Sequence, residues 1–258
     1  MLRPLQRVIL FSEVVRLIVG TDKKIFRVHK DMLCLHSCSF AARFSDPSFD
    51  EDDEDEEIAL PVIKAALFAD FVSYLYTGSF LRVLADISGE PGGVGASELW
   101  ELGTFLKAPG FQNMRLDSFR ANFKQGNTSW PHVGEIETTY PVAKKGSSLR
   151  KFAAHSMVCK NPFVVNKEGS EVFKAWKQLL VRTPDIALDM AMCAGQQWGG
   201  TMPWDDENRA MYMEKEEPLE ERWDKYILST RTKEEIKKEA EAKCVRSIIE
   251  LEHLVRKK

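Results

Sequence analysis

The sequence predicts an α+β protein in which a few short strands come first and helices follow. Between residues 14 and 19, Val15, Leu17 and Val19 alternate with Arg16, the period-two pattern of a half-buried strand. From residue 99 onward, apolar side chains instead recur every three or four positions, as on a helix that buries one face. This order favours a small sheet of short strands flanked by helices and continued by a mainly α-helical C-terminal region.

A hairpin and two short helices are expected within the first 45 residues. Turn residues at 20–24 follow the first strand, and residues 25–28 are predicted to form the returning strand. Asp31 is placed to cap one short apolar helix and Ser37 to cap a second. Both side chains can accept hydrogen bonds from the free N–H groups of a first helical turn.

A third short strand and a longer helix are expected next. Residues 58–60 are apolar and are followed by Pro61, so they are predicted to join the sheet. Apolar side chains between residues 62 and 76 lie at helical spacing, and Gly78 is placed to end that helix because glycine readily adopts the left-handed conformation. Residues 86–97 are rich in glycine and predict an exposed loop.

The rest of the chain predicts a second, helical part. Helical spacing stops at Pro109 and resumes over the residues that lead up to 123. A boundary segment at 127–131 then divides the chain into two predicted domains, 12–123 and 129–258. Two core-facing stripes are expected beyond it: Leu149, Phe152, Ala153 and Ser156, then Val172, Phe173, Trp176, Leu179 and Leu180. After a loop at 195–203, the last predicted helix carries an apolar row that includes the helix-docking candidates Ile236, Ile248, Leu251 and Val255.

Composition and charge restrict the class of protein. The chain has 258 residues, of which 44% are hydrophobic and 29% charged, which excludes disordered, collagen-like and disulfide-scaffold proteins. The formal net charge of −3 comes from one unbroken acidic run, Asp50–Glu57, and would be positive without it. No strongly basic stripe is present, so no nucleic-acid partner is expected.

The apolar runs and the cysteines bear on location. The longest uncharged stretch, residues 190–204, is diluted by glycine and glutamine, so no membrane span or membrane partner is expected, and the N-terminal apolar run is too short for a secretory signal. The five cysteines are odd in number and scattered, which favours reduced thiols in the nucleus or cytoplasm. No cofactor is expected.

Several short motifs, taken in order, resemble a known family. They are Ser12-Glu13-Val14-Val15, Phe26-Arg27-Val28-His29-Lys30, Leu33-Cys34 and Ser37, followed by Ile58-Ala59-Leu60-Pro61, Tyr74-Leu75-Tyr76-Thr77-Gly78 and Leu99 to Asn113. Together they resemble a BTB/POZ domain over residues 12–123, and residues 145–150 are similar to the helical extension of stand-alone fungal members. Beyond residue 165 no resemblance is found.

The resemblance implies a protein–protein interaction module without catalysis, which often homodimerises and often serves as an adaptor for cullin-type ubiquitin ligases. It implies a charged dimer pocket at Glu13 and Lys30, where Glu13 stands in place of the family's usual aspartate. It also implies a cullin contact in which Phe49 is the apolar anchor and Glu51 adds a charge-assisted hydrogen bond. The alternative for Phe49 is that it folds back on the core beside a solvated acidic loop.

Three segments carry residue types that could serve a metal site, a nucleophile or a phosphate loop. Cys34, His36 and Cys38 suggest zinc, but on one helix His36 points away from the two cysteines and the sequence offers no matching second pair. His155 and Cys159, four apart on a predicted helix, suggest a nucleophilic dyad, although half-buried packing explains them better. Residues 89–97 are Gly-rich but lack the Gly-Lys-Ser/Thr ending of a phosphate loop.

The sequence therefore predicts an adaptor or scaffold rather than an enzyme, with a cullin ubiquitin ligase as one destination of its partners. The alternative within binding proteins is a self-associating scaffold or nuclear regulatory protein without ubiquitin function. In that case removal of the chain after Trp223 should weaken self-association. A cysteine-dependent enzyme built on Cys159 is the remote alternative.

Overall fold

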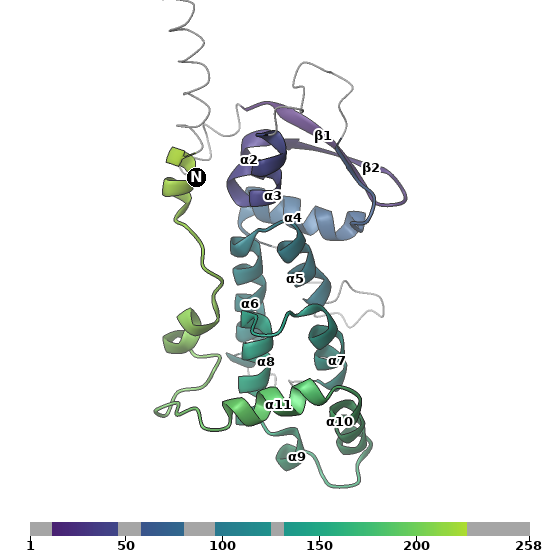
Figure 1. The fold of residues 1–258 in the computed structure, drawn as a ribbon, viewed down its shortest axis with the longest axis vertical. Coiled ribbons are helices and arrows are strands. Elements are labelled where there is room, and N and C mark those ends of the chain that lie inside the picture. Colours follow the sequence, from purple (N-terminus) through teal and green to yellow (C-terminus); the bar gives the residue numbers. More distant parts are fainter. Residues whose placement is uncertain (1–11, 46–57, 80–95, 125–131, 226–258) are drawn as a thin grey trace, which may run out of the picture. The chain divides into compact units, whose positions relative to one another are not determined.

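The computed structural model describes residues 12–45, 58–79, 96–124 and 132–225, and its elements confirm the predicted α+β class (Figure 1). In chain order they are β1 (Val14–Val19), β2 (Lys24–His29), α2 (Lys30–His36), α3 (Cys38–Phe44), β3 (Ile58–Leu60), α4 (Ala65–Thr77), α5 (Ala96–Phe105), α6 (Pro109–Lys124), α7 (Val133–Val142), α8 (Ser148–Cys159), α9 (Pro162–Val165), α10 (Glu171–Arg182), α11 (Pro184–Cys193) and the 3-10 helix η1 (Asp206–Tyr212). Residues 1–216 form one compact unit, and residues 217–258 form a second.

The sheet has the strand order β2-β1-β3, with β1 antiparallel to β2 and parallel to β3. The predicted alternation on β1 is present, because Leu17 and Val19 are fully buried while Arg16 is exposed. The antiparallel register pairs Val14 with His29, which brings the residue before β1 close to the residue that begins α2. This pairing places Glu13 next to Lys30.

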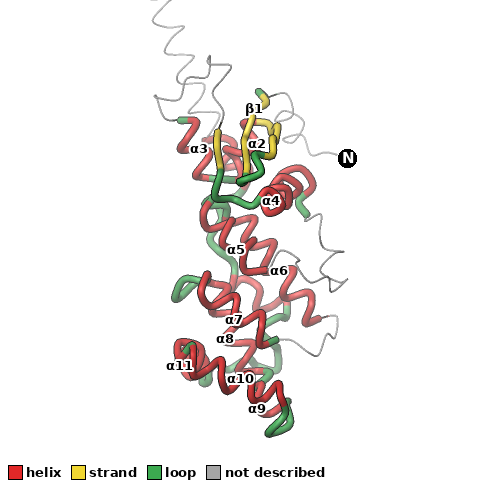
Figure 2. Tube along the Cα trace, turned by 90° about the vertical axis from the view of Figure 1, so that its right-hand side faces the viewer, coloured by secondary structure: helices red, strands yellow, loops and turns green. Residues whose placement is uncertain are grey.

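Helices α2, α3 and α4 lie beside this sheet (Figure 2), and aromatic rings fill the space between them. Phe26 on β2 meets Phe68 on α4 edge to face, with ring centroids 5.0 Å apart, and Phe68 also packs against Phe40 on α3. Phe68 and Phe71 are fully buried. Each such side chain contributes about 1.5–3 kcal/mol when it leaves water, so these rings hold the sheet to the helices.

The predicted caps are confirmed for Ser37 and wrong for Asp31. Ser37 Oγ accepts the N–H of Phe40 at 3.2 Å and so caps α3. Helix α2 begins at Lys30, so Asp31 lies inside its first turn, and Ser12 Oγ accepts the Asp31 N–H instead. A side chain from the segment before β1 therefore takes the capping role that the sequence assigns to Asp31.

Helix α4 begins at Ala65, three residues later than predicted, and ends as expected at Gly78. Gly78 has φ 69° and donates its N–H to Tyr74 O at 2.9 Å. Residues 62–64 instead turn from β3 into the helix, because the Ile63 N–H bonds back to Leu60 O.

The helical part shares one core with α5 and α6. Buried side chains from α5 to η1 form a single cluster, comprising Trp100, Leu116, Phe119, Ile136, Tyr140, Ala143, Leu149, Phe152, Ala153, Met157, Trp176, Leu179, Ile186 and Tyr212. The division into domains 12–123 and 129–258 stays a prediction from the sequence. In space, the helices on either side of residues 125–131 bury the same apolar surface.

Of the two predicted core-facing stripes, the first is confirmed in full and the second only in part. Leu149, Phe152, Ala153 and Ser156 are all buried, as expected. On α10, Trp176 and Leu179 are buried, whereas Val172 is 49% exposed and so does not belong to the buried stripe that the sequence predicts.

Among the described residues, none of the helices has the length and apolar character that a membrane crossing requires.

Candidate protein-interaction surfaces

The predicted dimer-pocket residues Glu13 and Lys30 lie together at the edge of the sheet. The Lys30 N–H donates to Glu13 O at 2.8 Å, and Lys30 Nζ lies 4.0 Å from Glu13 Oε2. The lysine side chain is only 12% exposed and its ammonium group sits 5.3 Å from the ring centroid of Phe44, whereas the glutamate side chain is 56% exposed. Glu13 thus reaches Lys30 from the solvent side, and the amine is held against an aromatic face.

The neighbouring His29 joins this edge to the end of α4. Tyr76 Oη accepts the backbone N–H of His29 at 3.1 Å and lies 2.7 Å from His29 Nδ1. The two rings meet edge to face. His29 therefore has a structural role in fixing the junction between β2 and α2.

An open groove lies between the start of α4 and α5. It is lined by Val62, Ile63, Lys64, Leu67, Glu98, Glu101, Leu102 and Phe105. Val62 is 79% and Phe105 55% exposed, so apolar side chains face solvent at its rim, while Lys64 pairs with Glu98 across it. Phe105 is therefore an exception to the expectation that the apolar side chains spaced from residue 99 onward face the core.

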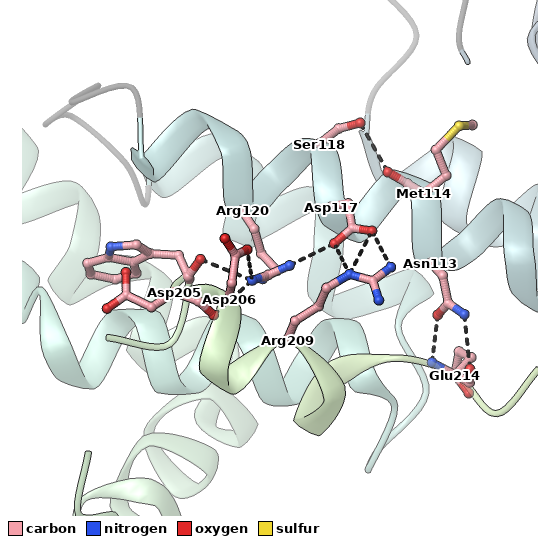
Figure 3. A network of polar contacts seen from close by, with 10 residues as sticks. Asn113, Met114, Asp117, Ser118, Arg120, Asp205, Asp206, Arg209 and Glu214 are labelled. Atoms are coloured by element: carbon pink, nitrogen blue, oxygen red, sulfur yellow. Dashed lines mark hydrogen bonds and ion pairs between the residues drawn. The ribbon is translucent and has the colours of Figure 1, made fainter. Parts of the chain in front are cut away.

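A polar network joins α6 to the segment around η1 (Figure 3). Arg120, whose side chain is 4% exposed, donates to Asp117 Oδ1 at 2.7 Å and to the backbone carbonyl of Asp205 at 2.8 Å. Arg209 binds both carboxylate oxygens of the same aspartate, at 2.9 Å from Nε to Oδ1 and 2.6 Å from Nη2 to Oδ2. Two arginines thus share one carboxylate, which fixes η1 on α6.

Further along α6, Asn113 holds Glu214 by its backbone (Figure 3). Asn113 Nδ2 donates to Glu214 O at 3.0 Å, and Asn113 Oδ1 accepts the Glu214 N–H at 2.6 Å. These two bonds occupy both the backbone N–H and the backbone C=O of Glu214. The residue after Tyr212, Met213, is extended, with φ −78° and ψ 134°.

A second ionic cluster lies between α8 and α11. Arg150 is buried, donates to Asp185 Oδ2 at 2.8 Å and also pairs with Asp189, and its guanidinium lies 4.6 Å from the ring centroid of Tyr140. Hydrogen bonding from Arg150 lowers the pKa of the Asp185 carboxyl, while burial raises the pKa of the Tyr140 hydroxyl. The cluster joins three helices of the shared core.

The surroundings of His155 and Cys159 favour packing over a nucleophilic dyad. His155 is 4% exposed, its Nδ1 lies 2.7 Å from Tyr212 Oη, and its ring packs edge to face on Trp198. Burial lowers the pKa of the imidazole to about 4 and raises the pKa of the Cys159 thiol. A raised thiol pKa reduces the thiolate fraction, which is the opposite of what a nucleophile needs.

The zinc hypothesis at Cys34, His36 and Cys38 gains no support from the geometry. Cys34 is buried and Cys38 is exposed, and the His36 ring packs edge to face on Tyr74. Within the described part of the chain, no three His, Cys, Asp or Glu side chains gather as a metal site would require.

Other sequence candidates lie outside the described residues. These are the cullin-contact candidates Phe49 and Glu51 with the acidic run, and the helix-docking candidates Ile236, Ile248, Leu251 and Val255.

The polar network on α6 was not predicted from the sequence. Asn113 and Glu214 are 101 residues apart in sequence, so no local pattern connects them.

Comparison with known proteins gives one family. Residues 10–87 match the family model of the BTB/POZ domain. A search of curated proteins found no match. The matched range contains β1 to β3 and α2 to α4, including Glu13 and Lys30.

Proposed function

Because this chain carries a BTB/POZ domain, a protein–protein interaction module, we propose that it acts as an adaptor or scaffold that brings protein partners together. The observation that carries the proposal is the match of residues 10–87, which include the sheet and the first helices. The core shared by α5 to η1 supports it as well. Phe71 on α4 packs edge to face on Phe111 on α6, so a partner surface on this core would be joined to the matched region through α6.

The finer proposal is that one partner is a cullin scaffold. Phe49 would insert into an apolar pocket and Glu51 would add a charge-assisted hydrogen bond, while the acidic run at 50–57 would favour a basic partner surface. An aromatic anchor of this kind typically contributes about 2 kcal/mol or more to binding.

Calorimetric titration of the purified full chain with a cullin N-terminal domain tests this proposal. The wild type is expected to bind and Phe49→Ala to bind at least tenfold more weakly, about 1.4 kcal/mol. The control is Val164→Ala, which removes an exposed aliphatic side chain from α9 and should leave binding unchanged. A well-folded wild type that does not bind the cullin would remove the ligase role.

A second candidate function is self-association, and the Glu13–Lys30 pair favours it. A nearly buried ammonium group beside a half-exposed carboxylate is placed to exchange partners with a second copy. Light scattering should give twice the mass of one chain for the wild type and a single-chain mass for Lys30→Ala. Removal of residues 224–258 tests the contribution of the helix-docking candidates, which should weaken association if they take part.

The proposal includes no catalysis and a nuclear or cytoplasmic location. The raised pKa of the Cys159 thiol and the engagement of His155 by Tyr212 support the first part. Labelling with a thiolate-selective probe from pH 6 to 10 should show no reactivity at Cys159 below the ordinary thiol range, about 8.5. The odd number and scattered positions of the five cysteines favour a reducing compartment, which imaging of a fluorescent fusion would test.

A further inference from the structure

Residues 213–216 form an arm that leaves η1 with extended backbone at Met213, and the way in which α6 holds it is typical of peptide recognition. The side-chain amide of Asn113 exchanges two hydrogen bonds with the backbone of Glu214. Every residue except proline offers the same N–H and C=O pair, so this contact holds an extended chain whatever its side chains are. Asn113 is 8% exposed, so its orientation is fixed by its surroundings.

The arm's first acidic side chain lies in a site built for an anion. Glu214 Oε1 accepts the N–H of Ser148 at 3.4 Å, and Ser148 is the first residue of α8. Lys144 and Lys145 line the same open cavity of about 350 Å³, together with Glu214. A helix N-terminus favours a carboxylate, Lys144 and Lys145 add positive charge to the lining, and the cavity leaves room for a larger acidic group.

The arm's second acidic side chain lies two residues further on, at the start of α6. Any side chain on Gly110 would collide with the Glu216 carboxylate and the Tyr74 hydroxyl, so the glycine leaves room for both. Glu214 contacts the first residue of α8 and Glu216 lies against Gly110 on α6, so both carboxylates face the helices. The spacing therefore selects acidic residues at alternate positions.

We infer that this surface, made by Asn113, Gly110, Ser148, Lys144 and Lys145, is a binding site for an extended acidic peptide, and that residues 213–216 occupy it within the chain. The residues before the arm are anchored independently, since Tyr212 is fully buried and Arg209 binds Asp117. Lys215 and Glu216, in contrast, are exposed. The arm can leave while Tyr212 stays in place, and a partner segment with the same chemistry can then enter.

Occupation by the arm makes this site self-inhibited. A tethered segment competes at an effective concentration in the millimolar range, so an added peptide binds the wild type with a correspondingly weakened apparent affinity. The inference does not depend on the proposed adaptor function, because neither a cullin nor a second copy of the chain contributes to the site.

The test is binding of a fluorescently labelled peptide with the sequence of residues 213–218 to the full chain, followed by anisotropy. Glu214→Pro removes the N–H that Asn113 accepts, so the arm is released and the peptide should bind at least tenfold more tightly than to the wild type. Adding Asn113→Ala to that variant should abolish the gain. A peptide with both glutamates replaced by glutamine should bind at least tenfold more weakly.

Two variants keep the test interpretable. Lys215→Ala changes an exposed side chain of the arm and should leave the affinity as in the wild type. If circular dichroism finds Glu214→Pro unfolded, the double variant Glu214→Ala with Glu216→Ala removes both carboxylate contacts but keeps the backbone bonds to Asn113, and a smaller gain in the same direction is expected. Folded variants that do not bind the peptide, or that bind it equally well without Asn113, would overturn the inference and leave the arm as an internal strap.

Discussion

At the scale of single residues, a few polar side chains join segments that are far apart in the sequence. Ser37 Oγ caps α3 and also donates to the carbonyl of Leu106, 69 residues away. The cap follows from the local sequence, because serine before an apolar helix is a common signal. The second bond does not, since it depends on where α5 ends in space. The local sequence therefore predicts the cap by Ser37 but not its bond to Leu106.

Replacing Ser37 with alanine should destabilise the fold by about 2 kcal/mol, since the change removes a cap and leaves the Leu106 carbonyl without its hydroxyl donor. Ser39→Ala is the matched control, because Ser39 Oγ donates only to the Phe105 carbonyl at an exposed site and should cost less than about 1 kcal/mol. Urea unfolding followed by circular dichroism would compare the two. Equal losses would contradict the dual role of Ser37.

Protonation of His155 should destabilise the helical part in mild acid. Its pKa is about 4 in the folded protein against 6.5 in an exposed state, so the unfolded chain binds the extra proton first as the pH falls. Stability is therefore full above pH 6.5 and decreases down to about pH 4, by up to about 3 kcal/mol. The shift is caused by burial and secondarily by the charge of Lys151.

Urea unfolding at pH 7.5, 5.5 and 4.5 would measure this dependence in the wild type and in His155→Gln. The variant should lose most of the dependence between pH 6.5 and 4. His132→Gln, which changes an exposed imidazole, should retain it. The same acid sensitivity in all three proteins would assign it to other groups.

At the scale of elements, sequence periodicity predicted most of the strands and helices, and it failed where the ends depend on other segments. The strands at 14–19 and 58–60 and the end of α4 at Gly78 are confirmed. The starts of α2 and α4 were wrong because the Ser12 hydroxyl and the Leu60 carbonyl bind the backbone there. The 3-10 helix η1 was missed because Arg209 and Tyr212 hold it through contacts with distant helices.

Two glycines, one that ends α4 and one inside α7, should respond in opposite ways to alanine. Gly78 has φ 69° and no neighbour within 4 Å of an added Cβ, so Gly78→Ala should cost about 1–2 kcal/mol from backbone strain alone. Gly134 lies in α7 with equally open space and ordinary helical φ, so Gly134→Ala should stabilise by up to about 1 kcal/mol. Thermal unfolding of the two variants would test both signs, and a loss in both would point to unrecognised packing.

At the scale of the whole molecule, the shared core determines what can fold alone. Trp100 on α5 and Leu116 and Phe119 on α6 are buried in the cluster that continues to Tyr212. Sequence analysis identified apolar stripes on both sides of residues 127–131 but not that they meet. Helical periodicity states which face is buried and not which neighbour covers it.

This core predicts different outcomes for two shortened chains. A chain ending at residue 216 keeps the whole cluster and should unfold in one cooperative thermal transition. A chain ending at residue 124 contains Trp100, Leu116 and Phe119 without the helices that cover them, so it should expose an apolar patch, bind a hydrophobic dye and aggregate. Light scattering and calorimetry of both chains would measure these outcomes.

Trp176→Ala in the full chain tests whether α10 and α6 stabilise each other through this cluster. Trp176 is 1% exposed within the same cluster, and its truncation should cost about 3–5 kcal/mol. Because α6 contributes to that cluster, hydrogen exchange should increase on α6 as well as on α10. If the chain ending at residue 124 instead remains monomeric and unfolds cooperatively, and Trp176→Ala leaves exchange on α6 unchanged, then the BTB/POZ part folds independently and the helical region is an addition to it.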